Sequence, residues 1–172
     1  MIRYYAEGVG MPKVKRLINR QWIKMVCEKY DRKVGDIVFV FTDKQTITSL
    51  NKEYNMMDSL TDIITVRYRE EGVVNGEIFI LLEQVRSNAK RAKVSIQDEL
   101  DRTMIHSILD LCGVESRTQE DQEVMSQAEK EAMLMKAAIR AAKTLARVYK
   151  EETQKYYDRY HILKNQSNED KD

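Results

Sequence analysis

Residues 95–113 read SIQDELDRTMIHSILDLCG, and this stretch predicts the helix around which the rest of the fold packs. Ser95 and Asp98 have the spacing of a capping box at the start of a helix, and Gly113 stands where a C-cap residue belongs. Apolar residues recur at helical spacing in two neighbouring stripes: Ile96, Leu100, Met104, Ile108 and Leu111 in the first, and Ile105, Leu109 and Cys112 in the second. A helix that is apolar on most of its circumference is buried, so we expect this helix in the middle of a domain.

Shorter elements are predicted on both sides of this helix. Apolar, β-rich runs predict strands over residues 2–5, 36–41, 61–68 and 77–82, with Asn75-Gly76 as the turn signal between the last two. Helical spacing predicts helices over residues 14–30, around Ile47 and Leu50, around Val85 and Ala89, and from Thr118 onward. Strands come first and helices accumulate later, so the predicted fold class is α/β (α+β): a small mixed sheet packed with helices, a central buried helix and a long C-terminal helix.

The composition indicates a globular cytoplasmic protein. The 172 residues are 42% hydrophobic and 33% charged, which excludes a disordered chain, and the formal net charge of +1 provides no overall attraction to nucleic acid. The first residues lack the pattern of a signal peptide, and the apolar runs are too short to span a membrane. Two cysteines, Cys27 and Cys112, without a secretory signal are typical of a reduced, cytoplasmic protein.

The predicted central helix carries a polar line that its burial does not explain. Arg102, His106 and Asp110 follow at four-residue steps and therefore share one face. His106 and Asp110 are candidate ligands of a divalent metal, and a catalytic zinc would need a third ligand, for which Glu115 and Ser116 are available. Taken alone, this pattern favours the other interpretation, in which His106 and Asp110 form a hydrogen-bonded pair.

The predicted C-terminal helix has a basic stripe and an apolar stripe on opposite sides. The basic stripe consists of Lys136, Arg140, Lys143, Arg147 and Lys150, and the apolar stripe of Leu134, Ala138, Ala141, Leu145 and Val148. Lys136, Arg140, Lys143 and Arg147 are candidates for RNA binding through phosphates, although a plain solvated face is the simpler interpretation. The apolar stripe has heptad-like spacing, which leaves open self-association through this helix.

Several motifs resemble one known family. They are the segments Val34-Gly35-Asp36-Ile37, Leu60-Thr61-Asp62-Ile63-Ile64-Thr65, Gly76-Glu77-Ile78-Phe79-Ile80, Val85-Arg86-Ser87-Asn88-Ala89 and residues 104–113. Together they resemble the YbeY family of metal-dependent rRNA-maturation endoribonucleases, in the variant typical of Bacteroidetes-like bacteria. The resemblance extends from the N-terminus to about Leu134. We therefore expect a YbeY-like domain over residues 1–135, a helical extension over 136–164 and a disordered tail over 165–172.

The resemblance implies a cytoplasmic, metal-assisted hydrolase of single-stranded RNA that acts in rRNA maturation and ribosome quality control. It places the family's three metal ligands, usually histidines that hold zinc, at His106, Asp110 and Ser116, and a catalytic arginine at Asn55. Only His106 keeps the family's residue, so we expect metal binding to be weak or absent and hydrolysis to be impaired. The alternative is a pseudoenzyme that binds RNA or the ribosome without cutting.

Overall fold

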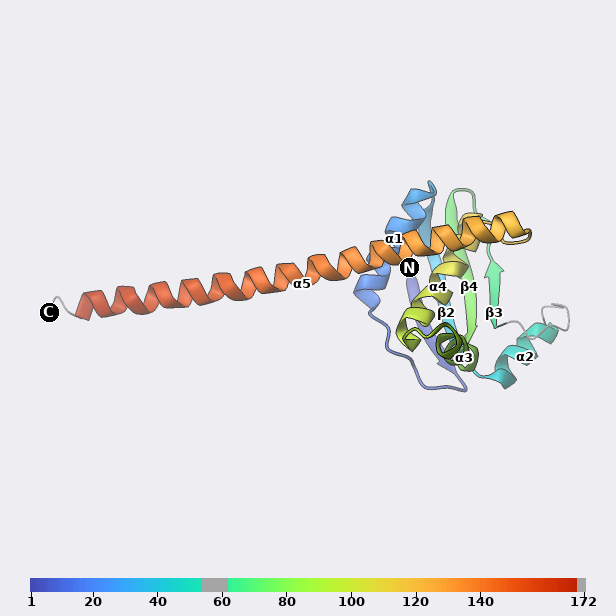
Figure 1. The fold of residues 1–172 in the computed structure, drawn as a ribbon, viewed down its shortest axis with the longest axis horizontal. Coiled ribbons are helices and arrows are strands. Elements are labelled where there is room, and N and C mark those ends of the chain that lie inside the picture. The colour runs from blue at the N-terminus through green and yellow to red at the C-terminus, as the bar shows by residue number, and fades with distance from the viewer. Residues whose placement is uncertain (54–61, 170–172) are drawn as a thin grey trace. The chain divides into compact units, whose positions relative to one another are not determined.

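A computed structural model describes residues 1–53 and 62–169, and within these ranges four strands form one mixed sheet (Figure 1). The strands β1 (Ile2–Glu7), β2 (Lys33–Thr42), β4 (Val73–Leu81) and β3 (Ile63–Arg67) are neighbours in that order. The pairs β1–β2 and β2–β4 are parallel, whereas β3 and β4 are antiparallel. The fold is therefore the predicted mixed α/β class, and the strand order places β2 and β4 in the middle of the sheet.

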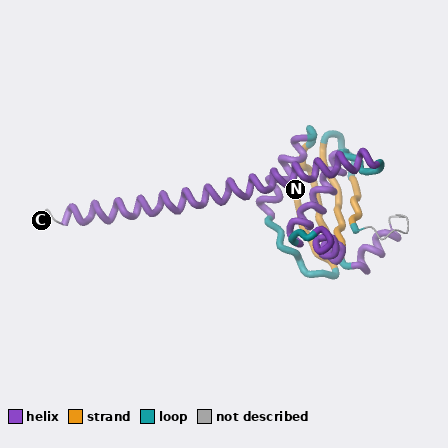
Figure 2. The backbone as a smooth tube through the Cα atoms, in the orientation of Figure 1, coloured by secondary structure: helices purple, strands orange, loops and turns teal. Residues whose placement is uncertain are grey.

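The two faces of the sheet are covered by different helices because side chains alternate along a strand. On one face, Phe79 and Leu81 of β4 pack with Ile47 of α2 (Lys44–Glu53). On the other face, α4 (Ile96–Cys112) contacts β3 and β4, and α1 (Arg16–Lys29) contacts β2 and α4. The helix α3 (Leu82–Ala92) follows β4 directly and packs against α4 (Figure 2).

The central helix α4 confirms the prediction made from residues 95–113. The Ser95 Oγ accepts a hydrogen bond from the Asp98 backbone N–H at 3.0 Å, and Gly113 ends the helix with a φ of +101°. Met104, Ile105, Ile108 and Leu109 are all fully buried. A helix with buried side chains on so much of its circumference needs partners on several sides, which α1, α3 and the sheet provide.

The turn between β3 and β4 lies earlier than Asn75-Gly76, so that detail of the sequence prediction is wrong. Both residues belong to β4, and the chain reverses around Gly72, whose φ of +70° suits glycine. Gly76 serves close packing instead, because a Cβ there would lie 2.5 Å from the Val66 carbonyl oxygen. The glycine that suggested a turn in the sequence is therefore required for strand packing instead.

The last helix, α5 (Gln119–Glu169), extends over both of the compact units into which the chain divides, Met1–Lys136 and Ala137–Asp172. Within the first unit, Met125, Ala128 and Ala132 of α5 are buried, whereas in the second unit Leu145 is 57% exposed. The predicted domain limits at residues 135 and 164 and the predicted disordered tail stay predictions. Among the helices of the described residues, none combines the length and apolar composition that a membrane crossing requires.

Candidate functional site

The polar line predicted on α4 is present. Between Glu99 and Cys112, Arg102, His106 and Asp110 are the residues of α4 that are not buried. Their four-residue spacing places them one above another on the helix surface. Polar groups of neighbouring elements can therefore contact α4 on the side that carries the polar line.

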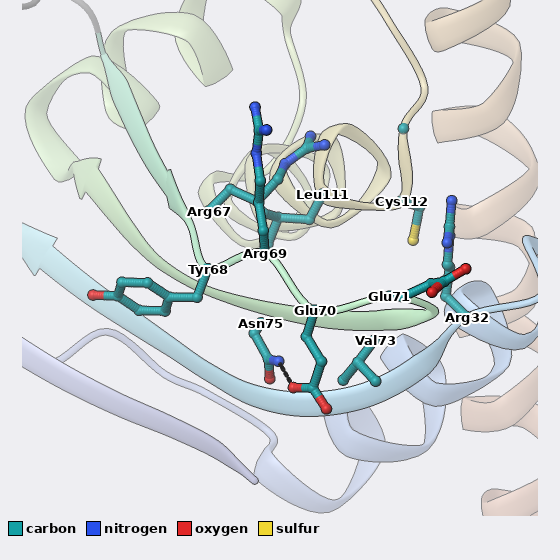
Figure 3. A pocket seen from close by; sticks show the side chains of 11 residues that line it. Arg32, Arg67, Tyr68, Arg69, Glu70, Glu71, Val73, Asn75, Leu111 and Cys112 are labelled. Carbon is teal, nitrogen blue, oxygen red and sulfur yellow. Dashed lines mark hydrogen bonds between the residues drawn. The ribbon is translucent and has the colours of Figure 1, made fainter.

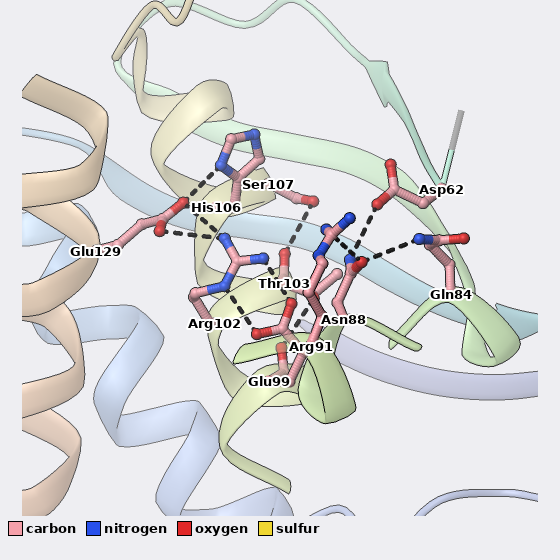
Figure 4. A network of polar contacts seen from close by, with 10 residues as sticks. All are labelled: Asp62, Gln84, Asn88, Arg91, Glu99, Arg102, Thr103, His106, Ser107 and Glu129. Carbon is pink, nitrogen blue, oxygen red and sulfur yellow. Dashed lines mark hydrogen bonds and ion pairs between the residues drawn. The ribbon is translucent and has the colours of Figure 1, made fainter. Parts of the chain in front are cut away.

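His106 is held by Glu129, a residue of α5 within the first compact unit. The His106 Nδ1 lies 2.7 Å from Glu129 Oε1, and the imidazole side chain is 31% exposed (Figure 4). A carboxylate oxygen accepts a hydrogen bond, so Nδ1 is the ring nitrogen that donates to Glu129. The arrangement orients the ring and leaves Nε2 as the nitrogen that can accept a proton or bind a ligand.

Arg102 fixes the Glu129 carboxylate from the other side. Its Nη1 lies 3.2 Å from Glu129 Oε2, and its Nη2 donates to Glu99 Oε1 at 2.6 Å. The hydrogen bond to the nearly buried Glu99 and the charge of Glu129 raise the pKa of the Arg102 guanidinium, so the group stays charged. One positive charge between two carboxylates keeps Glu129 in place to receive the His106 hydrogen bond.

Asp110, the third residue of the polar line, is paired with Arg67 at the end of β3. Arg67 Nη2 lies 3.7 Å from Asp110 Oδ2 and also donates a hydrogen bond to the Asp110 backbone carbonyl. The Asp110 side chain is 45% exposed, so the ion pair is open to solvent. The carboxylate thus lies opposite a guanidinium of the same chain.

A cavity of about 380 Å³ lies beside this ion pair, between the β3–β4 connection and the C-terminal end of α4 (Figure 3). We call it the hairpin pocket. Its lining includes three arginines, Arg32, Arg67 and Arg69, together with Tyr68. The pocket therefore adjoins the polar line on its Asp110 side.

Comparison with known proteins decides which family this arrangement belongs to. The family model described as "Endoribonuclease YbeY" matches residues 8–137. The chain belongs to the endoribonuclease YbeY family. It is 42% identical to the endoribonuclease YbeY of Porphyromonas gingivalis over 134 residues, which cover 78% of this chain and 89% of the relative. The YbeY protein of Bacteroides fragilis is 37% identical over 135 residues, covering 78% of this chain and 97% of that protein.

A solved structure supports the fold. The solution structure of a protein from Thermotoga maritima superposes with a TM-score of 0.58, at 24% identity, and covers 83% of this chain and 93% of that protein. At this identity the likeness supports the fold alone. The resemblance to YbeY and the fold class expected from the sequence are therefore both confirmed.

The donors at the ligand positions expected from the YbeY resemblance do not fit a tightly held zinc ion. Asp110 is paired with Arg67, and Ser116, half-buried in the segment after α4, offers only a neutral hydroxyl. The Glu115 carboxylate, the other candidate third ligand, lies 4.0 Å from the guanidinium of Arg117. Within the described part of the chain, no three His, Cys, Asp or Glu side chains are grouped so that they could hold a metal ion.

Two other predicted sites have different outcomes. Asn55, expected at the position of a catalytic arginine, lies outside the described residues. On α5, Lys143 and Arg147 are exposed, and Arg140 is partly exposed. The roles expected for His106, Asp110, Ser116 and Asn55 in catalysis or metal binding, and for Arg140, Lys143 and Arg147 in RNA binding, stay predictions.

Lys136 does not belong to an exposed basic stripe, so its predicted place is wrong. Its side chain is 2% exposed, and its Nζ forms an ion pair of 2.7 Å with Asp101 Oδ1, itself fully buried. The Nζ also lies 4.1 Å from the centre of the Trp22 ring. The ammonium group is therefore used inside the first compact unit and cannot reach a phosphate on the surface.

The sequence interpretation missed Glu129 and the arginines of the hairpin pocket. Glu129 comes 23 residues after His106, and nothing in the spacing indicates that the two side chains meet. The alternation Arg67-Tyr68-Arg69 at the end of a predicted strand was the available signal. Alternate residues of an extended strand share a face, so the two arginines could have been recognised as a local basic patch.

Proposed function

We propose that this chain binds single-stranded ribosomal RNA in the cytoplasm during rRNA maturation, and that its metal-assisted hydrolysis of that RNA is impaired. The supporting observation is the pairing of Asp110 with Arg67, together with a serine at the third ligand position. Family membership supports an RNA substrate, and the altered ligand positions support the loss of rate.

We expect hydrolysis to be impaired because of the number and type of metal-ligand donors at this site. A divalent metal in a hydrolase activates water and needs several charged or nitrogen ligands to hold it. Here His106 offers one nitrogen, Asp110 is paired with a guanidinium, and Ser116 offers only a neutral hydroxyl. Since these residues do not fit the metal, we assign no hydrolytic step to it.

His106 nevertheless keeps a defined orientation. The Arg102–Glu129 pair holds its Nδ1, which is the type of support that carboxylates give to functional histidines. The fixed orientation of His106 supports some remaining activity. We therefore propose an impaired hydrolase before a protein without activity. The alternative is a pseudoenzyme, which would bind RNA in the same way and show no turnover that depends on His106.

A cleavage assay tests the proposal. The purified full chain and the P. gingivalis relative are each incubated with labelled single-stranded RNA and manganese, magnesium or zinc, and metal content is measured in parallel. We expect turnover lower than that of the relative by about 10²-fold or more, because removal of a single group that stabilises transition-state charge already costs this much. His106→Ala is the control for activity that belongs to this site. Robust turnover that His106→Ala abolishes would overturn the claim of impairment.

Self-association through α5 stays a further candidate property. In its apolar stripe, Leu134 is 71% exposed, Leu145 57% and Val148 45%. Exposed apolar residues at heptad-like spacing favour a helix partner. Sedimentation velocity of the full chain over a range of concentrations measures whether a dimer forms.

A further inference from the structure

The exposed part of α5 begins where the match to the YbeY family ends. That match ends at residue 137, whereas α5 continues as one helix to Glu169 (Figure 1). From residue 141 to residue 162 every residue is exposed, so no element of the described chain covers this part of the helix. Helices in proteins gain most of their stability when an amphipathic side packs against another element. A partner from outside the chain can supply that packing here.

An apolar stripe rich in tyrosine follows one side of this exposed helix. We call it the tyrosine stripe, and it consists of Leu145, Tyr149, Tyr156 and Tyr160, at steps of four, seven and four residues. At 3.6 residues per turn, these positions lie within about 60° of one another around the helix axis. All four side chains are more than half exposed. The stripe thus continues well beyond Val148, where the apolar stripe expected from the sequence ended.

The charges along the exposed helix are distributed unevenly. Residues 137–150 contain basic residues and no acidic one, which gives a charge of +4: Arg140, Lys143, Arg147 and Lys150. Residues 151–162 contain three acidic and two basic residues, which gives a charge of −1: Glu151, Glu152, Asp158, Lys155 and Arg159. A parallel pair of these helices in register would place +4 beside +4, whereas an antiparallel pair places +4 beside −1. Charges at the sides of paired helices set their orientation, so this distribution favours an antiparallel pair.

The positions of the basic residues favour a second helix over RNA as the occupant of the stripe. Exposed tyrosine rings can stack on bases, but such sites also need a cationic groove beside the rings that follows the phosphates. Lys143 and Arg147 are each turned by about 160° from Leu145 around the helix axis, so they lie on the opposite side. A helix partner, in contrast, needs an apolar stripe with charges at its sides.

We propose that the tyrosine stripe forms the interface of an antiparallel homodimer, in which it packs against the same stripe of a second copy of this chain. Its spacing of four, seven and four residues reads the same in both directions. A twofold antiparallel pair therefore places the leucine opposite the last tyrosine and the two middle tyrosines opposite each other. Glu152, on the same side of the helix, has a cation of its own, since Lys155 Nζ donates to its Oε1 at 2.6 Å. The proposal goes beyond RNA binding and does not depend on it.

Sedimentation velocity of the full chain over a range of concentrations tests the interface, with variants at two neighbouring positions. The test variant is Tyr156→Glu, and the matched control is Tyr157→Glu, which has the same composition and net charge. Tyr157 is also exposed, but it is turned by about 100° from Tyr156. Its ring centroid lies 4.3 Å from that of His161 on the same helix.

We expect Tyr156→Glu to raise the dissociation constant of the dimer by at least about tenfold, because twofold symmetry buries two carboxylates without partners. The control should change it by less than about threefold, as a surface substitution does. Circular dichroism of both variants establishes that the fold is kept.

Energy transfer between dyes tests the orientation. Labels are attached at Lys143→Cys or His161→Cys, two positions off the stripe that are about 27 Å apart along the helix. Cys27 and Cys112 are buried and do not compete for the dye in the folded protein. In an antiparallel pair, transfer should be more efficient from position 143 of one copy to position 161 of the other than between the two copies of position 161. A parallel pair gives the reverse order.

Each outcome decides the proposal. A dimer that Tyr156→Glu alone weakens, with the most efficient transfer between positions 143 and 161, supports it. A wild type that stays monomeric, an equal loss in both variants, or the most efficient transfer between two copies of position 161 overturns it. A monomeric wild type whose RNA binding is weakened by Tyr156→Glu would assign the stripe to RNA and also overturns it. The proposed function in rRNA maturation is tested separately by the cleavage assay.

Discussion

The buried ion pair between Lys136 and Asp101 makes a quantitative prediction about stability. The Lys136 side chain is 2% exposed and the Asp101 side chain 0%, so replacing Lys136 by Met would leave a carboxylate buried without its partner. Removal of one member of a buried pair costs about 3–5 kcal/mol, because the remaining charge keeps its desolvation penalty. Part of this cost is the cation–π contact with the Trp22 ring, 4.1 Å from the ammonium, which is worth about 1–2 kcal/mol and which Met also loses.

Urea unfolding measures this loss directly. Trp22 is the single tryptophan and is fully buried beside Lys136, so its fluorescence reports the unfolding of this region. We expect Lys136→Met to lower the free energy of unfolding by about 3–5 kcal/mol with little change in the urea dependence. Lys130→Met, at an exposed position of the same helix, is the control and should change it by less than about 0.5 kcal/mol.

A double mutant isolates the cause. In Lys136→Met/Asp101→Asn no charge is left without a partner, and the Asn oxygen can still accept from Gln97, which bonds Asp101 at 2.9 Å. The double mutant should therefore be more stable than Lys136→Met alone. A cost below about 1 kcal/mol for Lys136→Met, or a double mutant no more stable than the single one, would refute the reasoning about an uncompensated charge.

Three further predictions concern pH, metal and thiols. Burial raises the pKa of Tyr4 to about 12, above its ordinary value of 10.0, so stability relative to Tyr4→Phe should be constant below pH 10 and fall as pH rises toward 12, measured by urea unfolding. Replacing Asp110 and Ser116 by His should increase the zinc retained after dialysis, measured by metal analysis, because two nitrogen ligands are restored; unchanged zinc content would contradict this. Cys27 and Cys112, 0% and 6% exposed, should react with a thiol reagent only after unfolding, and rapid labelling of the native protein would contradict their burial.

The sequence by itself determined the central helix and the fold class. Ser95 and Gly113 act on the backbone of their own helix, and the apolar periodicity between them depends only on helix geometry. Such local features can be predicted from the sequence because the interacting groups are neighbours along the chain. The same holds for the polar line of α4, since its spacing alone places its residues on one side. The prediction of a turn at Asn75-Gly76 was wrong because glycine is required at position 76 for another reason. The Val66 backbone, which belongs to another strand, approaches it too closely for a side chain.

Only the tertiary structure decided which charged groups meet. Arg67 and Asp110 are 43 residues apart, and His106 and Glu129 are 23 apart, so their pairing depends on how β3 and α5 pack against α4. Lys136 shows the physical reason most directly. Its position on a helix follows from the sequence, but whether that side of the helix faces water or the buried Asp101 depends on packing between distant segments. A charge that looks solvated in the sequence can therefore be a buried ion pair, and a carboxylate that looks like a metal ligand can already hold a guanidinium.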